Sequence, residues 1–453
     1  MSAARRERLA LAASITGAVV VALDGTVLSV AQPSLQHDLH TTAGAVQWTS
    51  TGYLVAVAAL LVFAGRLGDR YGHRRVFTTG VVGFAAASAG IGLAPGIGWV
   101  IALRVVQGIA GALLQPATLG MLRAVFPADR LAGPIALRTG AIGLAAAVGP
   151  LVGGALTAHF GWRAVFFLTL VPAAGAGLLI LAVPLPGPAR GEDTGGLDLP
   201  GAALLALTLG CLVQSLVGLP SPGSALGLAA AAALGLAFAR HERRTARPLL
   251  PPAVLRSAGV APALGALLAA SAALSGTLFL GTYFLQDVLA LDPLRSALRA
   301  LPLAVTMVLA APASTWLAKR HGARETVVSG MVLVALGVLL ISGSDRSSGP
   351  VEIGAGFLLL GAGFGTVLAT ATAVVVRATA ASRAGVAGGL QQTAMNVGPA
   401  LGVALATTVA GPAAVGTALG AAGPVLAAVA AGGALLAARI PGAQRGAAVP
   451  EGR

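Results

Sequence analysis

Charged and aromatic residues are scarce in this sequence, at 10% and 4% of its 453 residues. Soluble globular proteins carry about 25% charged residues, so the composition excludes a water-soluble enzyme of several domains. The single cysteine, Cys211, excludes an intrachain disulfide and a cysteine-based metal site. The six histidines are scattered without metal-ligand spacing, and we expect no metal and no cofactor. The shortage of aromatic rings also argues against an aromatic cage for a cation.

Motifs of nucleotide hydrolysis and of common hydrolases are also missing. The sequence has no P-loop, no Gly-x-Ser-x-Gly and no His-Glu-x-x-His, so ATP-driven transport and membrane-embedded hydrolysis lack the residues they need. The net charge of +14 would suggest nucleic acid binding in a soluble protein. Here the arginines lie in short loops between apolar runs, without interleaved aromatics, and we expect no nucleic acid partner.

Long apolar runs dominate the sequence. Each has about 20 residues, which is enough to cross the roughly 30 Å core of a bilayer as a helix. An even number of such spans would place both termini on the same side of the membrane. The fourteen runs lie at residues 9–32, 46–66, 76–94, 98–121, 135–157, 165–184, 200–219, 224–240, 258–283, 298–318, 326–343, 351–376, 386–410 and 420–440.

The positive charges support this count. Of the 29 lysines and arginines, 24 fall on the side that holds the N-terminus, which we call the arginine-rich side. Cytoplasmic loops carry the excess of positive charge, so we expect a multi-pass protein of the lipid bilayer with both termini cytoplasmic. Richness in alanine, glycine and arginine is typical of a GC-rich bacterial genome, which favours the bacterial cytoplasmic membrane.

Two echoes in the sequence indicate an internal duplication. LGDRYGHR at 67–74 recurs as LAKRHGAR at 317–324, and GPLVGG at 149–154 is echoed by GPALG at 398–402. The two offsets are nearly equal, and they leave room for six helices per repeat and two more between the repeats. We therefore predict an all-α integral membrane fold. Its parts are an N-terminal six-helix bundle, a two-helix insert with flanking loops and a C-terminal six-helix bundle, at residues 1–184, 185–257 and 258–453.

Two ionisable side chains lie inside predicted spans. Such groups cost about 2.5–3.5 kcal/mol each on insertion scales and are functional candidates. At 1.5 Å per residue, Asp24 lies about 13 Å from the outer end of the first span and Arg104 about 9 Å from that of the fourth. A carboxylate at this depth can take a proton from outside and release it inside, as proton coupling requires. The alternative is a static ion pair that joins the two helices.

The loop GRLGDRYGHRR at 65–75 combines helix-ending glycines with one acid and a cluster of cations. Asp69 can bind a helix N-terminus or an arginine across the arginine-rich side and so form a latch. Membrane topology alone would explain the cations, but not Asp69 or the glycine spacing. The predicted gate residues are Gly65, Asp69, Arg70, Gly72, Arg74 and Arg75.

Polar residues within the spans are candidates for a substrate cavity, and each could equally serve as an interhelical contact. Because few acidic residues lie inside the membrane, we expect neutral or weakly cationic amphiphiles as substrates. The candidates are Trp48, Tyr53, Gln107, Gln115, Tyr283, Gln286, Gln391, Gln392 and Asn396.

Taken in order, these segments resemble the major facilitator superfamily, and specifically its fourteen-helix drug:proton antiporters. Lys319 stands where the second-half loop of that family is acidic, which argues against a second latch. The similar segments, which together extend over nearly the whole chain, are LDGTVLSVAQP (23–33), GRLGDRYGHRR (65–75), RVVQGIAG (104–111), GPLVGG with GWRAVFFLTLVP (149–172), YFLQDVLALDPLRSALRALP (283–302) and GVAGGLQQTAMNVGPALGVAL (385–405).

The resemblance implies two bundles that rock about a central cavity, with Asp24 and Arg104 in proton coupling and Asp69 in the latch. It assigns an antiporter motif, typical of exporters, to Gly149, Pro150, Gly153 and Gly154. The expected function is export of a small lipophilic substrate, a drug or an antibiotic, by a monomer driven by the proton gradient. A dedicated exporter of one endogenous metabolite is the main alternative. A transport-inactive sensor or scaffold and a membrane enzyme are the others.

Overall fold

The described part of the chain is helical throughout. The computed structural model describes residues 2–41, 43–127, 129–182, 198–217, 219, 222–245, 248–249, 257–291, 293–379, 384–410 and 415–441. Within these ranges thirteen helical segments are long and apolar enough to span a membrane, and no strand occurs. The prediction of an all-α multi-pass membrane protein is therefore confirmed.

The N-terminal bundle contains the first six predicted spans. The sixth is divided at Thr169 into two helices, where the sequence analysis expects one. The fifth span, α5, is not among the thirteen segments, but it forms a continuous helix of 29 residues. The helices are α1 (Ala3–Asp38), α2 (Ala43–Tyr71), α3 (His73–Gly92), α4 (Ile97–Val125), α5 (Ala132–Phe160), α6 (Arg163–Leu168) and α7 (Leu170–Leu181).

The remaining helices form the insert and the C-terminal bundle. The chain passes from α11 into a short π-helical segment, η1, which the sequence analysis does not anticipate. The insert consists of α8 (Leu199–Val217) and α9 (Pro222–Arg244), and the C-terminal bundle consists of α11 (Val260–Tyr283), η1 (Phe284–Val288), α12 (Pro293–His321), α13 (Ala323–Ser342), α14 (Pro350–Arg377), α15 (Ala384–Ala410) and α16 (Val415–Ala437).

The two bundles repeat each other in local geometry. Gly72 and Gly322, which are equivalent in the sequence echo, precede α3 and α13 with φ angles of 91° and 92°. A positive φ is accessible to glycine without steric cost, which explains why both loops keep it. Further along, Gly80 and Gly330 let α3 approach α4 and α13 approach α14, because a Cβ on either would lie within 3 Å of a leucine or valine carbon.

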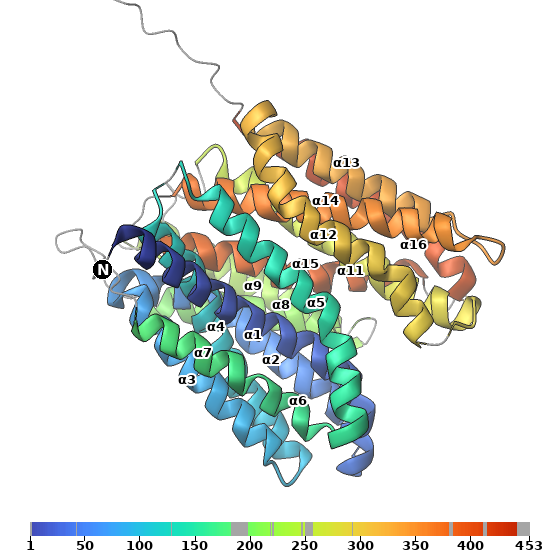
Figure 1. Cartoon of the computed structure of the whole chain (residues 1–453), viewed down its shortest axis with the longest axis horizontal. Helices are drawn as coiled ribbons and strands as arrows, with labels where there is room; N and C mark the ends of the chain where they lie inside the picture. Colours follow the sequence, from blue (N-terminus) through green and yellow to red (C-terminus); the bar gives the residue numbers. More distant parts are fainter. Residues whose placement is uncertain are drawn as a thin grey trace, which may run out of the picture.

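The insert packs on the junction between the bundles. In Figure 1, α1–α7 form one bundle and α11–α16 the other, with α8 and α9 on the far side of the junction. Helix α8 contacts both α2 and α15. Val213 of α8 is buried with Ala58 of α2 and Val397 of α15, so the insert bridges the two bundles.

The bundles meet in the half of the molecule that carries the arginine-rich side. One apolar cluster joins Leu122 of α4 and Ile135 of α5 to Val376 of α14, all fully buried. Alanines of α5, α12 and α14 form a second, smaller cluster across the same junction. Towards the opposite end the two bundles diverge (Figure 1). The packing therefore seals one end of the junction.

Candidate functional site

A buried ion pair connects α1 and α4. The Nη1 atom of Arg104 lies 2.6 Å from the Oδ2 atom of Asp24, and the two side chains are only 1% and 2% exposed. The depths inferred from the sequence therefore correspond to direct contact in the fold. Charges this deep in a bundle are stable only when paired and hydrogen-bonded.

Three further residues complete the coordination of this pair. Gln107, one turn after Arg104, accepts from its Nη1 at 2.6 Å and donates from Nε2 to Asp24 at 2.9 Å and to the Ser88 hydroxyl at 2.7 Å. The Nε of Arg104 donates to the Thr49 carbonyl at 3.0 Å. This ion-pair network, which consists of Asp24, Thr49, Ser88, Arg104 and Gln107, thus includes residues of each of the first four helices.

Tyr53 packs against the ion-pair network on the α2 side. The Arg104 guanidinium carbon lies 4.3 Å from the centre of the Tyr53 ring, a cation–π contact. Gly108 permits this approach, because a Cβ there would lie 2.6 Å from the Tyr53 carbonyl oxygen. The sequence analysis assigned Gln107 and Tyr53 to the substrate cavity, but the structure places them against the ion pair. Ser88, a lone serine in α3 that no sequence pattern marks, was not among the predicted site residues.

Asp69 binds the N-terminus of α15 in the other bundle. Its two carboxylate oxygens accept from the backbone N–H groups of Gly385 at 2.7 Å and Val386 at 3.1 Å. The exposed N–H groups and the helix dipole make this end of a helix a favourable position for an anion. This is the helix-end contact that the sequence analysis expected of a latch, and its partner lies more than 300 residues away.

Glycines let the two helices at this latch touch. A Cβ on Gly65 of α2 would overlap the Gly385 carbonyl oxygen, and a Cβ on Gly385 would overlap that of Gly65. One turn deeper, a Cβ on Gly389 would lie 2.7 Å from the Leu61 carbonyl oxygen. The backbone amides can reach Asp69 only because neither helix carries side chains here.

The other predicted gate residues have separate surroundings. Gly72 supplies the positive φ that turns the chain into α3. Arg74 donates to the Leu181 carbonyl at the C-terminus of α7 at 3.0 Å, while Arg70 lies over the Tyr71 ring. Arg75 is exposed. In this loop, Asp69 and Gly65 contact the other bundle, whereas the contacts of Arg70 and Arg74 given above lie within the N-terminal bundle.

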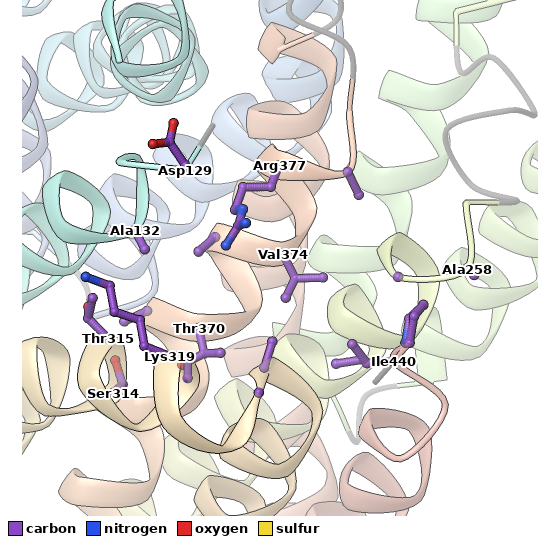
Figure 2. A pocket seen from close by; sticks show the side chains of 18 of the residues that line it. Asp129, Ala132, Ala258, Ser314, Thr315, Lys319, Thr370, Val374, Arg377 and Ile440 are labelled. Carbon is purple, nitrogen blue, oxygen red and sulfur yellow. The ribbon is translucent and has the colours of Figure 1, made fainter. Parts of the chain in front are cut away.

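The equivalent position in the second half holds a cavity instead of a latch. Lys319 occupies the place of Asp69 in the repeat, and it lines a cavity of about 760 Å³ together with Asp129, Ala132 and Arg377 (Figure 2). Helix α5 begins there without a capping side chain. A lysine cannot accept hydrogen bonds from a helix N-terminus, so Lys319 does not repeat the contact that Asp69 makes.

The predicted antiporter motif packs α5 onto α1. A Cβ on Gly149 would overlap the Thr26 hydroxyl oxygen, and one on Gly153 would lie 2.7 Å from a methyl group of Val27. Gly154 is half-buried, and the Pro150 side chain lies outside the described residues. The bare face of α5 therefore serves close packing two residues beyond Asp24, the proton-coupling candidate.

A cavity of about 250 Å³ lies between the bundles, and four of the predicted cavity residues line it. Gln392 donates to Gln115 across the junction, and Asn396 donates to the Gln392 carbonyl at 2.8 Å. We call this space the central cavity. Its lining consists of Ala18, Val21, Ala22, Gln115, Arg138, Thr139, Ile142, Leu368, Thr372, Gln391, Gln392, Met395 and Asn396.

The remaining predicted cavity residues lie elsewhere. Trp48 and Tyr283 are 47% and 45% exposed and do not line the central cavity. Tyr283 instead packs edge-on against Phe279. Gln286 belongs to η1, and its side chain lies outside the described residues.

Arg138 requires a correction. It was counted with the 24 cations of the arginine-rich side and not among the predicted site residues. It lies within α5, is 3% exposed and lines the central cavity. The apolar run that begins near residue 135 did not reveal this, because the arginine falls in its first turn.

Among the described residues no group of three or more metal-ligating side chains occurs.

The chain is similar in sequence to several proteins named for export, efflux or transport. The chain is 40% identical over 404 residues to the tetracenomycin C resistance and export protein of Streptomyces glaucescens, covering 87% of this chain and 74% of that protein. It is 33% identical over 414 residues to the multidrug efflux pump LfrA of Mycolicibacterium smegmatis, covering 89% and 81%. It is 33% identical over 421 residues to the probable actinorhodin transporter of Streptomyces coelicolor, covering 89% and 72%.

The fold is likewise that of a known transporter structure. The human organic anion transporter MFSD10 superposes with a TM-score of 0.66 at 17% identity, covering 96% of this chain and all of that one. A family model described as Major Facilitator Superfamily matches residues 15–403. With this helical fold and this extent of similarity, the chain belongs to the major facilitator superfamily of membrane transporters.

Proposed function

We propose that this protein exports lipophilic drugs or antibiotics across the bacterial cytoplasmic membrane in exchange for protons, as a member of the fourteen-helix drug:proton antiporters. The observation that carries the proposal is the buried Asp24–Arg104 pair with its Gln107 bridge. Relatives named for antibiotic resistance and export or for multidrug efflux support the substrate class.

Proton coupling follows from what protonation of Asp24 would do. A neutral carboxyl group no longer balances the charge of Arg104, so the pair loses most of its attraction. Arg104 also holds the Thr49 carbonyl, and Gln107 also holds the Ser88 hydroxyl. A proton on one side chain therefore loosens contacts among four helices. In this way protonation of Asp24 can change the packing of the whole bundle.

Orientation follows from the charge distribution. If the arginine-rich side is cytoplasmic, as positive loops favour, then the sealed end of the junction faces the cytoplasm. The Asp69 latch and the apolar cluster around Leu122 would then be the closed inner gate. The conformation would be one that takes up protons from, and releases substrate to, the outside.

Dye efflux tests this proposal. We would express the chain in a bacterium that lacks its own drug pumps, load cells with ethidium or Nile red, and follow efflux with and without a protonophore. Energised efflux should disappear with the protonophore and in Asp24→Asn. The matched control is Asp38→Asn, since Asp38 lies on the same helix but is half-exposed and paired with Arg163 at its outer end.

Each outcome has a distinct meaning. Efflux that survives Asp24→Asn would leave a transporter but would remove the coupling assignment. Efflux that survives the protonophore would contradict proton coupling. Failure to export either dye would contradict broad drug export and would favour a dedicated exporter of one compound. That second candidate has its own support, because the relative with 40% identity is named for a single compound, tetracenomycin C.

A further inference from the structure

Arg138 is a buried cation without a partner in the described structure. It is 3% exposed, its Nε atom is buried without a hydrogen bond, and no carboxylate is among the residues lining the cavity it faces. Burying an unpaired charge is costly, and Arg104, at comparable burial, is held by Asp24, Gln107 and Thr49. Packing alone therefore does not explain an arginine at this position.

Two more unpaired polar atoms line the same cavity. The Thr372 hydroxyl and the Gln391 carbonyl oxygen are buried without hydrogen-bond partners, and both residues are 1% exposed. Buried polar groups are normally satisfied, so three orphans around one space indicate a site that a ligand completes. The set offers a fixed cation, a hydroxyl and an amide oxygen, on α5, α14 and α15.

The rest of the lining determines which ligand fits. Val21, Ile142, Leu368 and Met395 supply an apolar wall, and a cavity of about 250 Å³ lies just below the range of roughly 300–1,000 Å³ typical of ligand sites. A guanidinium in an apolar site favours a planar anion, which it can bind through paired hydrogen bonds. The lining thus combines anion recognition with a lipophilic surface.

We infer that the central cavity is a substrate site for lipophilic anions, such as aromatic carboxylates or phenolates, with Arg138 as the residue that binds the negative charge. This inference rests on the proposed efflux function and replaces the expectation of neutral or cationic substrates. The Thr372 hydroxyl donates to a further oxygen atom of the substrate, and the Gln391 carbonyl oxygen accepts from a hydroxyl group of the substrate. Because α5 belongs to one bundle and α14 and α15 to the other, a bound anion contacts both moving halves.

Binding to the purified full-length protein in nanodiscs tests the inference. The probes are anthraquinone-2-carboxylate and anthraquinone-2-carboxamide, which share a ring system and a shape and differ in charge. Hydrogen bonds to charged groups are strong enough for about a 10- to 100-fold preference. We expect the carboxylate to bind at least about 10-fold more tightly to the unaltered protein.

Three variants separate charge recognition from structure. Arg138→Gln should weaken carboxylate binding about 10- to 100-fold and leave carboxamide binding within about twofold, while Arg138→Lys should keep a preference for the carboxylate. Arg130→Gln is the control, because it removes one arginine from the same side of the protein but at an exposed position paired with Glu7. Unliganded Arg138→Gln should unfold at the same or a higher temperature, since it removes an unpaired buried charge.

Several results would overturn the inference. The first is equal affinity of the unaltered protein for both probes, and the second is no binding of either probe. The third is an equal loss of affinity for the carboxylate and the carboxamide in Arg138→Gln. A lower unfolding temperature of Arg138→Gln without ligand would indicate a structural role instead. Nile red efflux, measured separately, distinguishes the two proposals. Efflux of the dye by a protein that does not prefer the carboxylate probe refutes only the anion site. Preference for the carboxylate probe in a protein that does not export the dye refutes only the proposed function.

Discussion

At the scale of single residues, the most important feature is a buried ion pair in which the loss of either partner would cost a large free energy. Asp24 and Arg104 are almost fully buried, and each satisfies the other. Removing one member of such a pair strands the remaining charge, with a typical cost of about 3–5 kcal/mol. Loss of transport in a single variant therefore does not by itself distinguish a coupling role from a structural one.

A double variant separates these roles. Arg104→Gln should lower thermal stability, and Asp24→Asn combined with Arg104→Gln should recover most of that loss, because two amides can hydrogen-bond without a stranded charge. Transport should remain absent in the double variant if Asp24 carries the proton. Thermal unfolding and dye efflux of the same preparations check this. A double variant that regains energised efflux would show that the pair is a static strut.

At the scale of elements, helix α15 is held at its N-terminus by a residue of the other bundle. Asp69→Asn should weaken this attachment, because a neutral amide accepts less strongly than a carboxylate and interacts less with the helix dipole. Hydrogen bonds to a charged group contribute about 1.5–3 kcal/mol. We therefore expect the sealed state to lose population by about 10-fold or more.

The measurement is protease access to the arginine-rich side in inverted membranes, which should increase in Asp69→Asn. Asp129→Asn is the matched control, because this carboxylate lies on the same side and lines the cavity at the position without a latch. Equal access in Asp69→Asn and the unaltered protein would contradict the latch. Increased access in both variants would point to a general effect of surface charge.

A second prediction at this scale concerns the contact between α5 and α1. Gly153→Leu would force a side chain into Val27 and the α1 backbone, and overpacking of this kind costs about 1–3 kcal/mol. It should lower the unfolding temperature and slow efflux, because α1 carries Asp24. Gly175→Leu is the control, since a Cβ there meets nothing within 4 Å. Equal effects of both substitutions would contradict a specific role for the glycine face.

At the scale of the whole molecule, contacts between the bundles are concentrated at one end of their junction. Cys211 is the sole cysteine, so its replacement by serine provides a background for single cysteines. Asn396→Cys in the central cavity should react with a membrane-impermeant maleimide added outside. Leu122→Cys in the apolar seal should stay protected, because that side chain is fully buried.

Labelling from both sides of the membrane would test the orientation. Inverted vesicles should show the opposite pattern only after the transporter is driven to its other state by substrate and a proton gradient. Labelling of Leu122→Cys from the outside would contradict the proposal that the sealed end faces the cytoplasm. Labelling of Asn396→Cys from neither side would contradict an open path to the central cavity.

Local pattern alone determined much of this protein. Apolar runs predicted the helical spans because a bilayer core admits little else. The loop echo predicted a repeat, and Gly72 and Gly322 in its two copies share a positive φ. Depth along the helix predicted that Asp24 and Arg104 would lie at similar depth in the membrane. These properties depend on residues near one another in the chain, or on spacing that a regular helix converts directly into distance.

Only the tertiary structure decided which helix faces meet. It moved Gln107 and Tyr53 from the expected cavity to the ion pair, and it gave Asp69 a partner more than 300 residues away. It also placed Arg138, which lies at the start of a predicted span and was not a predicted site residue, in the lining of the central cavity. In a chain that is apolar almost throughout, periodicity does not separate a lipid-facing side from an interior one. Rotation of each helix about its axis is therefore set by packing against distant helices.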